Sequence, residues 1–232
     1  MNTNILTDHY PTPDTFRFRI GGYQMSIFLK GIKKPLMVTL ALLLICGVAY
    51  PLLFTGLSQL IFPNQANGSL VMIDGKAVGS QLVGQDFTDT RFMKSRPSAV
   101  NYNTYTQDDK ENGSYTGFSS GSKNMGPTNP ELAERVKEDM AAFLKANPSV
   151  KQEDIPTDLL TASGSGLDPH ISAASAAVQI PALVENTGLS EDKLKNIVKD
   201  NTKGKVLGIF GEETVNVLNV NLEIAKELGL LN

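Results

Sequence analysis

The longest uninterrupted run of apolar residues lies near the N-terminus, in PLMVTLALLLICGVAYPLLFTGLSQLIF at positions 35–62. No charged residue occurs between Lys34 and Asp74. A helix needs about 20 apolar residues to cross the hydrocarbon core of a bilayer, and residues 36–59 meet that length. The apolar core of a removable signal peptide runs only about 7–15 residues, so we predict a retained transmembrane helix at 35–60.

The charges on either side of this helix predict its orientation. Lys33 and Lys34 directly precede it, whereas the first positive charge after it is Lys76. Because positive residues are retained in the cytoplasm, we expect residues 1–34 to form a cytoplasmic tail. Residues 61–232 then form an extracytoplasmic domain that the helix anchors to the membrane.

Beyond the membrane, short apolar segments alternate with turn-forming residues. SLVMIDGKAVGSQLVGQ (69–85) predicts two strands, because Asp74 followed by Gly75 suits the positive φ angles of a tight hairpin turn. GQDFTDTRFMKSRPSA (84–99) is interpreted as a further strand. Residues 101–124 have no apolar period and are expected to form a long irregular loop.

The stretch at 84–99 also mixes aromatic and basic residues. We expect Phe87 and Phe92 to lie in the core. We expect Arg91, Lys94 and Arg96 to contact carboxylates or backbone groups, and the run resembles a strand bordered by charges more than a phosphate site.

TNPELAERVKEDMAAFLKANP (128–148) predicts a helix. Asn129 can cap it, Pro130 suits its first position, and Pro148 ends it. Its apolar residues repeat at helical spacing and predict one buried face, made of Leu132, Val136, Met140, Phe143 and Leu144.

The C-terminal third combines helical and strand patterns. A helix is predicted from Ser172, with Pro181 bending or breaking it. Another is predicted from Ser190, with a buried stripe of Leu194, Ile197 and Val198. Val215 and Val217 alternate as in a strand, and a helix through Leu218, Leu222, Ala225 and Leu228 follows. Strands and helices without regular alternation predict an α+β domain.

Charge and cysteine content limit the classes of function and of stabilisation that the chain can have. Of the 21 basic and 24 acidic residues, 5 and 2 lie in residues 1–62, which leaves 16 and 22 in residues 63–232 and a net charge of −6 there. That balance argues against nucleic-acid binding, which favours a basic face. The single cysteine, Cys46, lies within the span, so no disulfide framework is expected.

TASGSGLDPHIS (161–172) contains serine, aspartate and histidine, the components of a catalytic triad. A nucleophile elbow requires Gly-x-Ser-x-Gly, and the residues around Ser165 lack both outer glycines. Turn-forming residues favour a rigid scaffold or docking loop instead, with Asp168 and His170 as its polar contacts. The alternative hypothesis is a membrane-tethered hydrolase that uses Ser165 or Ser163 with His170. A third hypothesis is a general extracytoplasmic binding module.

Other chemical motifs are incomplete. One histidine with scattered carboxylates makes a poor transition-metal site, and no EF-hand spacing occurs. GSKNMGPTNP (121–130) is not a phosphate-binding P-loop, because Gly-Lys-Ser/Thr does not follow at the required spacing.

Several motifs, in this order, resemble the C subunit of the Kdp-type potassium-transporting ATPase: one N-terminal span, GQ-x-F-T at 84–88, RPS at 96–98, GPTNP at 126–130, TASGSGLDPHIS at 161–172 and GEETVNVLNVNL at 211–222. The resemblance covers about residues 25–228. The positions that it marks are Gln85, Phe87, Arg96, Pro97, Asn129, Pro130, Thr161, Ser163, Ser165, Asp168, Pro169, His170, Gln179, Asn216, Asn219 and Asn221.

This resemblance implies a non-enzymatic subunit of an ATP-driven potassium uptake complex. Its expected partners are a channel-like A subunit, a P-type ATPase B subunit, a small F subunit and membrane lipid. The family's C subunit is described as a catalytic chaperone that raises the ATP affinity of the B subunit in a transient complex. No stably bound cofactor is expected, and ATP contact is confined to that complex. Because the outer domain faces away from the ATP side, it is also expected to cover the potassium entrance and steady the A–B arrangement.

Overall fold

The computed structural model describes residues 22–115 and 117–231, with residues 22–30 described by their backbone only. Most of the predicted cytoplasmic tail, residues 1–21, lies outside this description. The chain divides into two compact units, one ending at Ile61 and the other beginning at Phe62. Each unit is described below by itself.

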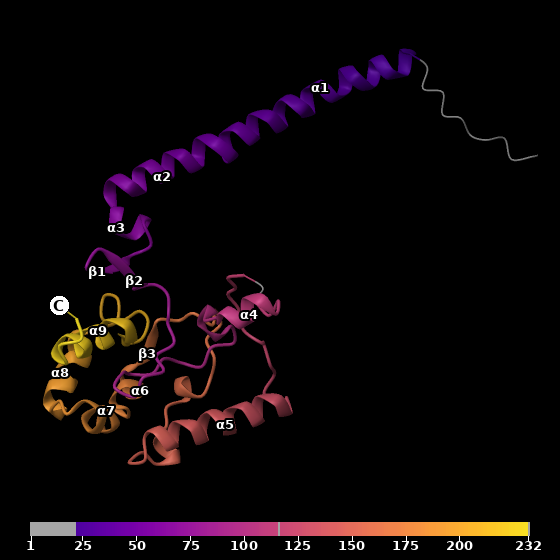
Figure 1. Ribbon diagram of the computed structural model, residues 1–232. Helices are drawn as coiled ribbons and strands as arrows, with labels where there is room; N and C mark the ends of the chain where they lie inside the picture. The colour runs from indigo at the N-terminus through magenta and orange to yellow at the C-terminus, as the bar shows by residue number, and fades with distance from the viewer. Residues whose placement is uncertain (1–21, 116, 232) are drawn as a thin grey trace, which may run out of the picture. The chain divides into compact units, whose positions relative to one another are not determined.

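The described part of the first unit is one long helical rod (Figure 1), made of α1 (Gly22–Leu44), the π-helical turn η1 (Ile45–Ala49) and α2 (Tyr50–Ile61). Its 31 residues from Gly31 to Ile61 are long and apolar enough to cross a membrane. Their side chains are not buried within the protein, as expected for a helix surrounded by lipid. The predicted span is therefore present as a helix, which begins earlier in the chain than its apolar core.

The π turn explains how the rod passes Pro51. Proline has no N–H and its ring crowds the preceding turn, which normally bends or breaks a helix. The N–H of Tyr50 donates to the carbonyl of Ile45, five residues back, so that one extra residue is accommodated directly before the proline. Such π turns are a recognised way for a helix to absorb a local irregularity.

The second unit begins with the short helix α3 (Pro63–Ala66) and the hairpin β1 (Leu70–Ile73) and β2 (Lys76–Ser80). The strands are antiparallel, and Asp74 and Gly75 connect them with φ angles of 50° and 74°. This confirms the predicted hairpin, whose turn needs positive φ at both central residues.

The remaining strands form a three-stranded antiparallel sheet in the order β3-β5-β4, made of β3 (His170–Ser172), β5 (Thr214–Asn216) and β4 (Thr202–Lys203). Four helices pack around it (Figure 1): α6 (Ala173–Ala177), α7 (Ile180–Thr187), α8 (Glu191–Asp200) and α9 (Val217–Glu227). The predicted mixture of helix and sheet is confirmed. Pro181 lies in the first turn of a new helix, so the predicted break at this residue is also confirmed.

The core lies between this sheet and its helices. It includes the predicted stripe of α8, Leu194, Ile197 and Val198, together with Ile171, Val215 and Ile224. Phe87 and Phe92 are partly buried and pack against it, in agreement with the prediction. Val217, expected in a strand, is instead the first residue of α9, because Asn216 caps that helix through the N–H of Asn219.

Short helices interrupt two irregular segments. η2 (Asn101–Asn103) and α4 (Gln107–Glu111) lie within residues 101–124, and η3 (Gln152–Asp154) and η4 (Thr157–Leu159) lie between residues 147 and 169. Thr106 and Asp109 form a reciprocal capping box at the start of α4. The expectation of a wholly irregular loop at 101–124 therefore missed η2 and α4, the second of which has its own start signal.

One expectation for the second unit was wrong, and another was met only in part. Residues 84–99 run without strand pairing over their length, because buried side chains rather than a neighbouring strand take up their backbone groups. The helix α5 (Pro130–Ala146) has the predicted cap, Asn129, but none of its residues is fully buried. Its predicted apolar stripe is the less exposed face but is only partly buried, since this helix lies outside the core cluster.

Candidate docking site

Asp168 is the centre of the polar contacts in the loop 161–172. Its carboxylate accepts a hydrogen bond from Arg96 Nη1 at 3.1 Å and one from the backbone N–H of His170 at 3.0 Å. The ring Nδ1 of His170 lies 3.5 Å from the same carboxylate. The His170 side chain, followed by the backbone bond and the Arg96 charge, holds the pKa of Asp168 below its ordinary 3.8 against the effect of burial. The loop is therefore fastened by a charged pair that stays ionised at neutral pH.

Close backbone contacts hold the rest of this loop. The N–H of Gly84 donates to the carbonyl of Leu167, and a Cβ at Gly84 would lie 2.5 Å from the carbonyl oxygen of Asp168. Ser98 Oγ donates to the carbonyl of Gly166 at 2.6 Å, and the N–H of Gly121 donates to the carbonyl of Ser165. Only glycine allows the approach at position 84, which explains the GQ motif next to this loop.

The serines of the loop have structural partners. Ser163 Oγ accepts from the N–H of Gly166, and Ser165 Oγ accepts from the N–H of Leu167. The described part of the chain contains no hydrogen bond between either hydroxyl and the imidazole of His170, which faces Asp168 instead. These contacts belong to tight turns and do not form the nucleophile–base pair that a serine hydrolase requires.

Strand pairing brings two distant motifs together. His170 pairs with Asn216 between β3 and β5, and the N–H of Val217 donates to the carbonyl of the buried Pro169. A hollow of about 400 Å³ opens here, lined by His170, Asn216 and Asn219 from the two motifs, and by Gln81, Leu82, Asp200, Asn201, Thr202, Lys203 and Thr214. We call it the amide hollow, because imidazole, amide and hydroxyl groups line most of it. Such groups can donate to and accept from a peptide backbone or polar side chains.

Gln179 and Asn221, two further marked positions, have a structural role that the sequence did not reveal. The amide of Asn221 accepts from the N–H of Met93 at 2.7 Å and donates to its carbonyl at 2.9 Å. Gln179 does the same for Lys94, at 2.8 and 3.2 Å. Gln179 and Asn221 are each 3% exposed. Their buried amides therefore make the backbone hydrogen bonds that a neighbouring strand would otherwise have made.

The other marked positions lie apart from the amide hollow. Gln85 donates to the carbonyl of Val78, and Thr161 donates to the carbonyl of Thr157. Asn129 and Pro130 form the start of α5. The predicted contacts of the basic residues are confirmed: Arg91 binds Asp89, and the ammonium of Lys94 binds the backbone carbonyls of Phe87 and Asp89.

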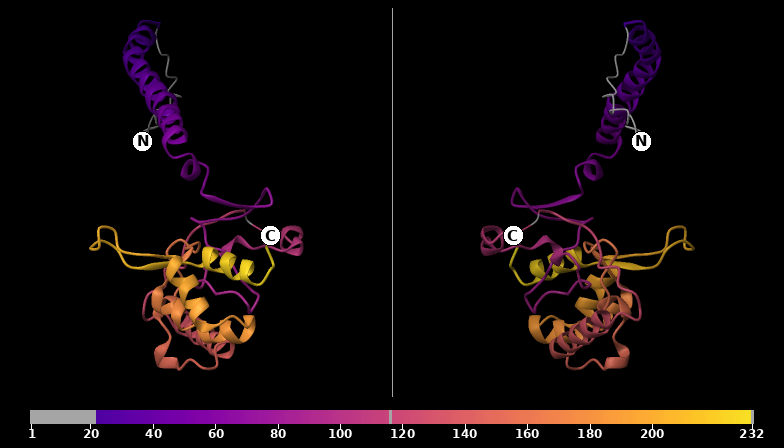
Figure 2. Two further views of the ribbon diagram at one scale, coloured as in Figure 1. Left: turned by 90° about the vertical axis from the view of Figure 1, so that its left-hand side faces the viewer. Right: turned by 90° about the vertical axis from the view of Figure 1, so that its right-hand side faces the viewer.

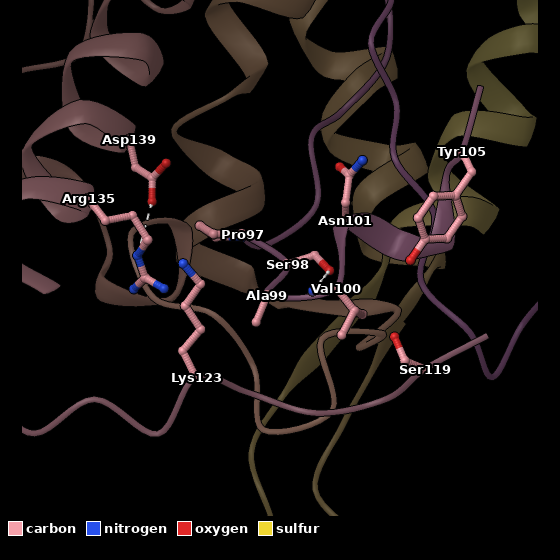
Figure 3. Close-up of a pocket in the computed structure, with 10 residues that line it drawn as sticks. All are labelled: Pro97, Ser98, Ala99, Val100, Asn101, Tyr105, Ser119, Lys123, Arg135 and Asp139. Atoms are coloured by element: carbon pink, nitrogen blue, oxygen red, sulfur yellow. Dashed lines mark hydrogen bonds and ion pairs between the residues drawn. The ribbon is translucent and has the colours of Figure 1, made fainter. Parts of the chain in front are cut away.

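A second hollow, of about 570 Å³, opens beside Pro97 (Figure 3). Lys123, Arg135 and Asp139 lie on one side of it, and Tyr105 and Ser119 lie on the other. Arg135 Nε and Asp139 Oδ2 are 3.7 Å apart, and burial raises the pKa of Asp139. Asn101 also lines it and is the first of three consecutive residues with φ near 50°. None of these three charged residues was predicted to belong to a site, although the i,i+4 spacing of Arg135 and Asp139 is a recognisable pairing signal.

Asp158 was also missed. It accepts hydrogen bonds from the N–H and hydroxyl of Ser172 and from the hydroxyl of Ser175, at 2.6 to 3.1 Å. Burial opposes its ionisation, but these hydrogen bonds leave the pKa of Asp158 below its ordinary value. It ties the end of the loop to the start of α6. Among residues 22–115 and 117–231, no group of three His, Cys, Asp or Glu residues could hold a metal ion.

Comparisons with known proteins agree on one family. Residues 32–226 match the family model "KdpC: K+-transporting ATPase, c chain". A protein of Clostridium kluyveri named potassium-transporting ATPase KdpC subunit is 74% identical over 90% of this chain and 99% of its own length. Proteins of the same name from Clostridioides difficile and Caldanaerobacter subterraneus are 58% and 43% identical, over 88% and 85% of this chain and 100% and 95% of their own lengths. The chain therefore belongs to the KdpC family and is an accessory subunit of the potassium-transporting ATPase complex, not its catalytic subunit.

Proposed function

We propose that the second unit docks on the extracytoplasmic side of the potassium-transporting ATPase and stabilises its assembly. The observation that carries this proposal is the amide hollow, where His170 from one motif meets Asn216 and Asn219 from another. Its groups suit recognition of a protein surface, and the serines nearby are engaged in turns. The proposed partners are the channel-like A subunit, the P-type ATPase B subunit and the small F subunit.

The extracytoplasmic placement rests on charge. Lys33 and Lys34 precede the apolar part of the rod, and no charged residue follows until Asp74. Lysines on the N-terminal side favour a cytoplasmic N-terminus, so the chain after Ile61 emerges on the opposite side. In that position the second unit would cover the potassium entrance of the channel-like subunit and steady its arrangement with the B subunit.

The proposed effect on ATP is indirect. The subunit raises the ATP affinity of the B subunit in a transient complex, and the helical rod is the only described part with access to the ATP side. Any contact with ATP is therefore made next to the B subunit and not in a site of the second unit. By linkage, ATP would then strengthen the binding of this chain to the B subunit by the same factor.

The docking proposal is tested by a double variant, His170→Ala with Asn219→Ala. The full-length tagged chain is purified from the membranes of cells grown at limiting potassium. Both side chains are part-exposed in the amide hollow, so we expect a folded chain, slightly destabilised by the lost contact between His170 and Asp168, with weaker recovery of the partner subunits and slower potassium uptake. The matched control is Asn112→Ala, an exposed asparagine outside the hollow, which should retain both. Full recovery and uptake in the double variant would overturn the role of the hollow. Recovery of unmodified chain without any ATPase subunit would overturn the proposed function itself.

A further inference from the structure

The loop between β4 and β5 ends in an apolar tip, defined as residues 206–210. Figure 2 shows this loop extending away from the helices of the second unit. Val206, Leu207, Ile209 and Phe210 are 60%, 84%, 75% and 64% exposed. Four large apolar side chains at the end of one projecting hairpin are unusual in a surface loop, which is normally polar.

The tip is a formed structure. The N–H of Val206 donates to the carbonyl of Phe210 at 2.8 Å, and the N–H of Phe210 donates back to Val206 at 3.0 Å. Gly208 and Ile209 donate to the carbonyls of Lys205 and Val206. Because these backbone groups are already paired, the tip can enter an apolar environment without leaving them unsatisfied.

Leu207 is poorly suited to its own turn. Its φ is 55°, in the left-handed region that costs a residue with a Cβ about 1–2 kcal/mol and that asparagine or glycine tolerates better. It is also the most exposed residue of the tip. A surface that covered this side chain would offset the strain with the free energy of apolar burial.

We propose that the apolar tip inserts into an apolar socket on another protein subunit of the potassium-transporting ATPase. Charge favours a protein over an anionic lipid surface: Lys203 and Lys205 lie on one side of the tip, and Glu212 and Glu213 lie on the other. A negative bilayer would attract the first pair and repel the second, whereas a protein surface can match both signs. The base of the hairpin, at Thr202, Lys203 and Thr214, also lines the amide hollow, so the tip belongs to the same hairpin as part of the proposed docking site. This inference rests on the proposed function.

Leu207→Asn separates docking from folding. Asparagine suits the left-handed turn, so the thermal midpoint of the purified full-length chain should stay unchanged or rise. Partner binding should weaken by roughly tenfold to a hundredfold, the loss expected for one buried leucine. Phe210→Ser should weaken binding similarly, while Phe118→Ser, an 87% exposed phenylalanine outside the tip, should have no effect. If unmodified chain recovers its partners and both tip variants recover them equally well, this inference fails while the proposed function stands.

A fluorescent probe identifies what covers the tip. Cys46 is the single cysteine, so Cys46→Ala with Leu207→Cys gives one site for a polarity-sensitive dye in full-length chain in nanodiscs. The expected result is a solvent-exposed dye in the chain alone and a blue-shifted dye after the other subunits are added. A blue shift in nanodiscs without those subunits would assign the tip to lipid and overturn the proposal. A dye exposed under both conditions would overturn it as well.

Discussion

At the scale of single residues, Asp168 has a structural role, although its motif contains the residue types of a catalytic triad. Its carboxylate joins the backbone and the ring of His170, two residues on in the same loop, with Arg96, which lies 72 residues earlier in the chain. The side chains of Arg96 and Asp168 are 23% and 28% exposed, so the pair is shielded but not fully buried. Its contribution to stability depends on Asp168 staying ionised.

This gives a prediction for the effect of pH. The pKa of Asp168 is lower in the folded protein than its ordinary 3.8, mainly because of His170. The stabilisation is therefore fully present above pH 3.8 and is lost as the pH falls through the lower, folded value. Asp168→Asn should lower the free energy of unfolding by about 1 kcal/mol at pH 7, since the pair is partly exposed. Thermal midpoints of both proteins across pH 7 to 3 should converge at the acid end, and a constant difference would contradict this account.

At the scale of elements, the extended segment 84–99 is held without a neighbouring strand. Asn221 on α9 and Gln179 before α7 each bind both backbone groups of one residue in it, Met93 and Lys94. Met93 is 0% exposed, so this connection also fixes a core side chain. The helix α5 presents the contrasting case, because it has a good cap and an apolar stripe but no core contact that buries it fully.

The amide clamp predicts a large effect from one isosteric change. Asn221→Leu would leave the N–H and carbonyl of Met93 buried and unpaired, at a cost of roughly 2–5 kcal/mol for the two groups. Asn219→Leu, on the same helix but part-exposed, should change the free energy of unfolding by less than about 1 kcal/mol. Thermal unfolding followed by circular dichroism measures both. Equal effects of the two substitutions would mean that the clamp is not what holds this segment.

At the scale of the whole molecule, the prediction concerns which side of the membrane each unit occupies. In a Cys46→Ala background, Lys151→Cys should react with a membrane-impermeant maleimide in intact cells, because it is exposed in the second unit. Lys33→Cys should react only after permeabilisation, because it precedes the uncharged apolar run that begins at Pro35. The opposite pattern would reverse the proposed orientation and with it the docking proposal.

Much of the local structure could be predicted because its causes lie within a few residues. Asp74-Gly75 formed its hairpin, and Asn129, Ser172 and Ser190 capped their helices. The strand prediction at 84–99 failed for the opposite reason. Its apolar and aromatic residues do face the core. The side chains that bind its backbone, however, belong to residues that lie 85 and 128 residues further along the chain.

The sequence by itself determined the apolar span, the family and the positions of caps and turns, because each depends on residue type and near neighbours along the chain. Only the tertiary structure decided what those marked residues do. Strand pairing set His170 beside Asn216 and opened the amide hollow, burial turned Gln179 and Asn221 into a backbone clamp, and the hairpin carried Leu207 to an exposed tip. These arrangements depend on contacts between segments distant in the chain, which a local pattern does not encode.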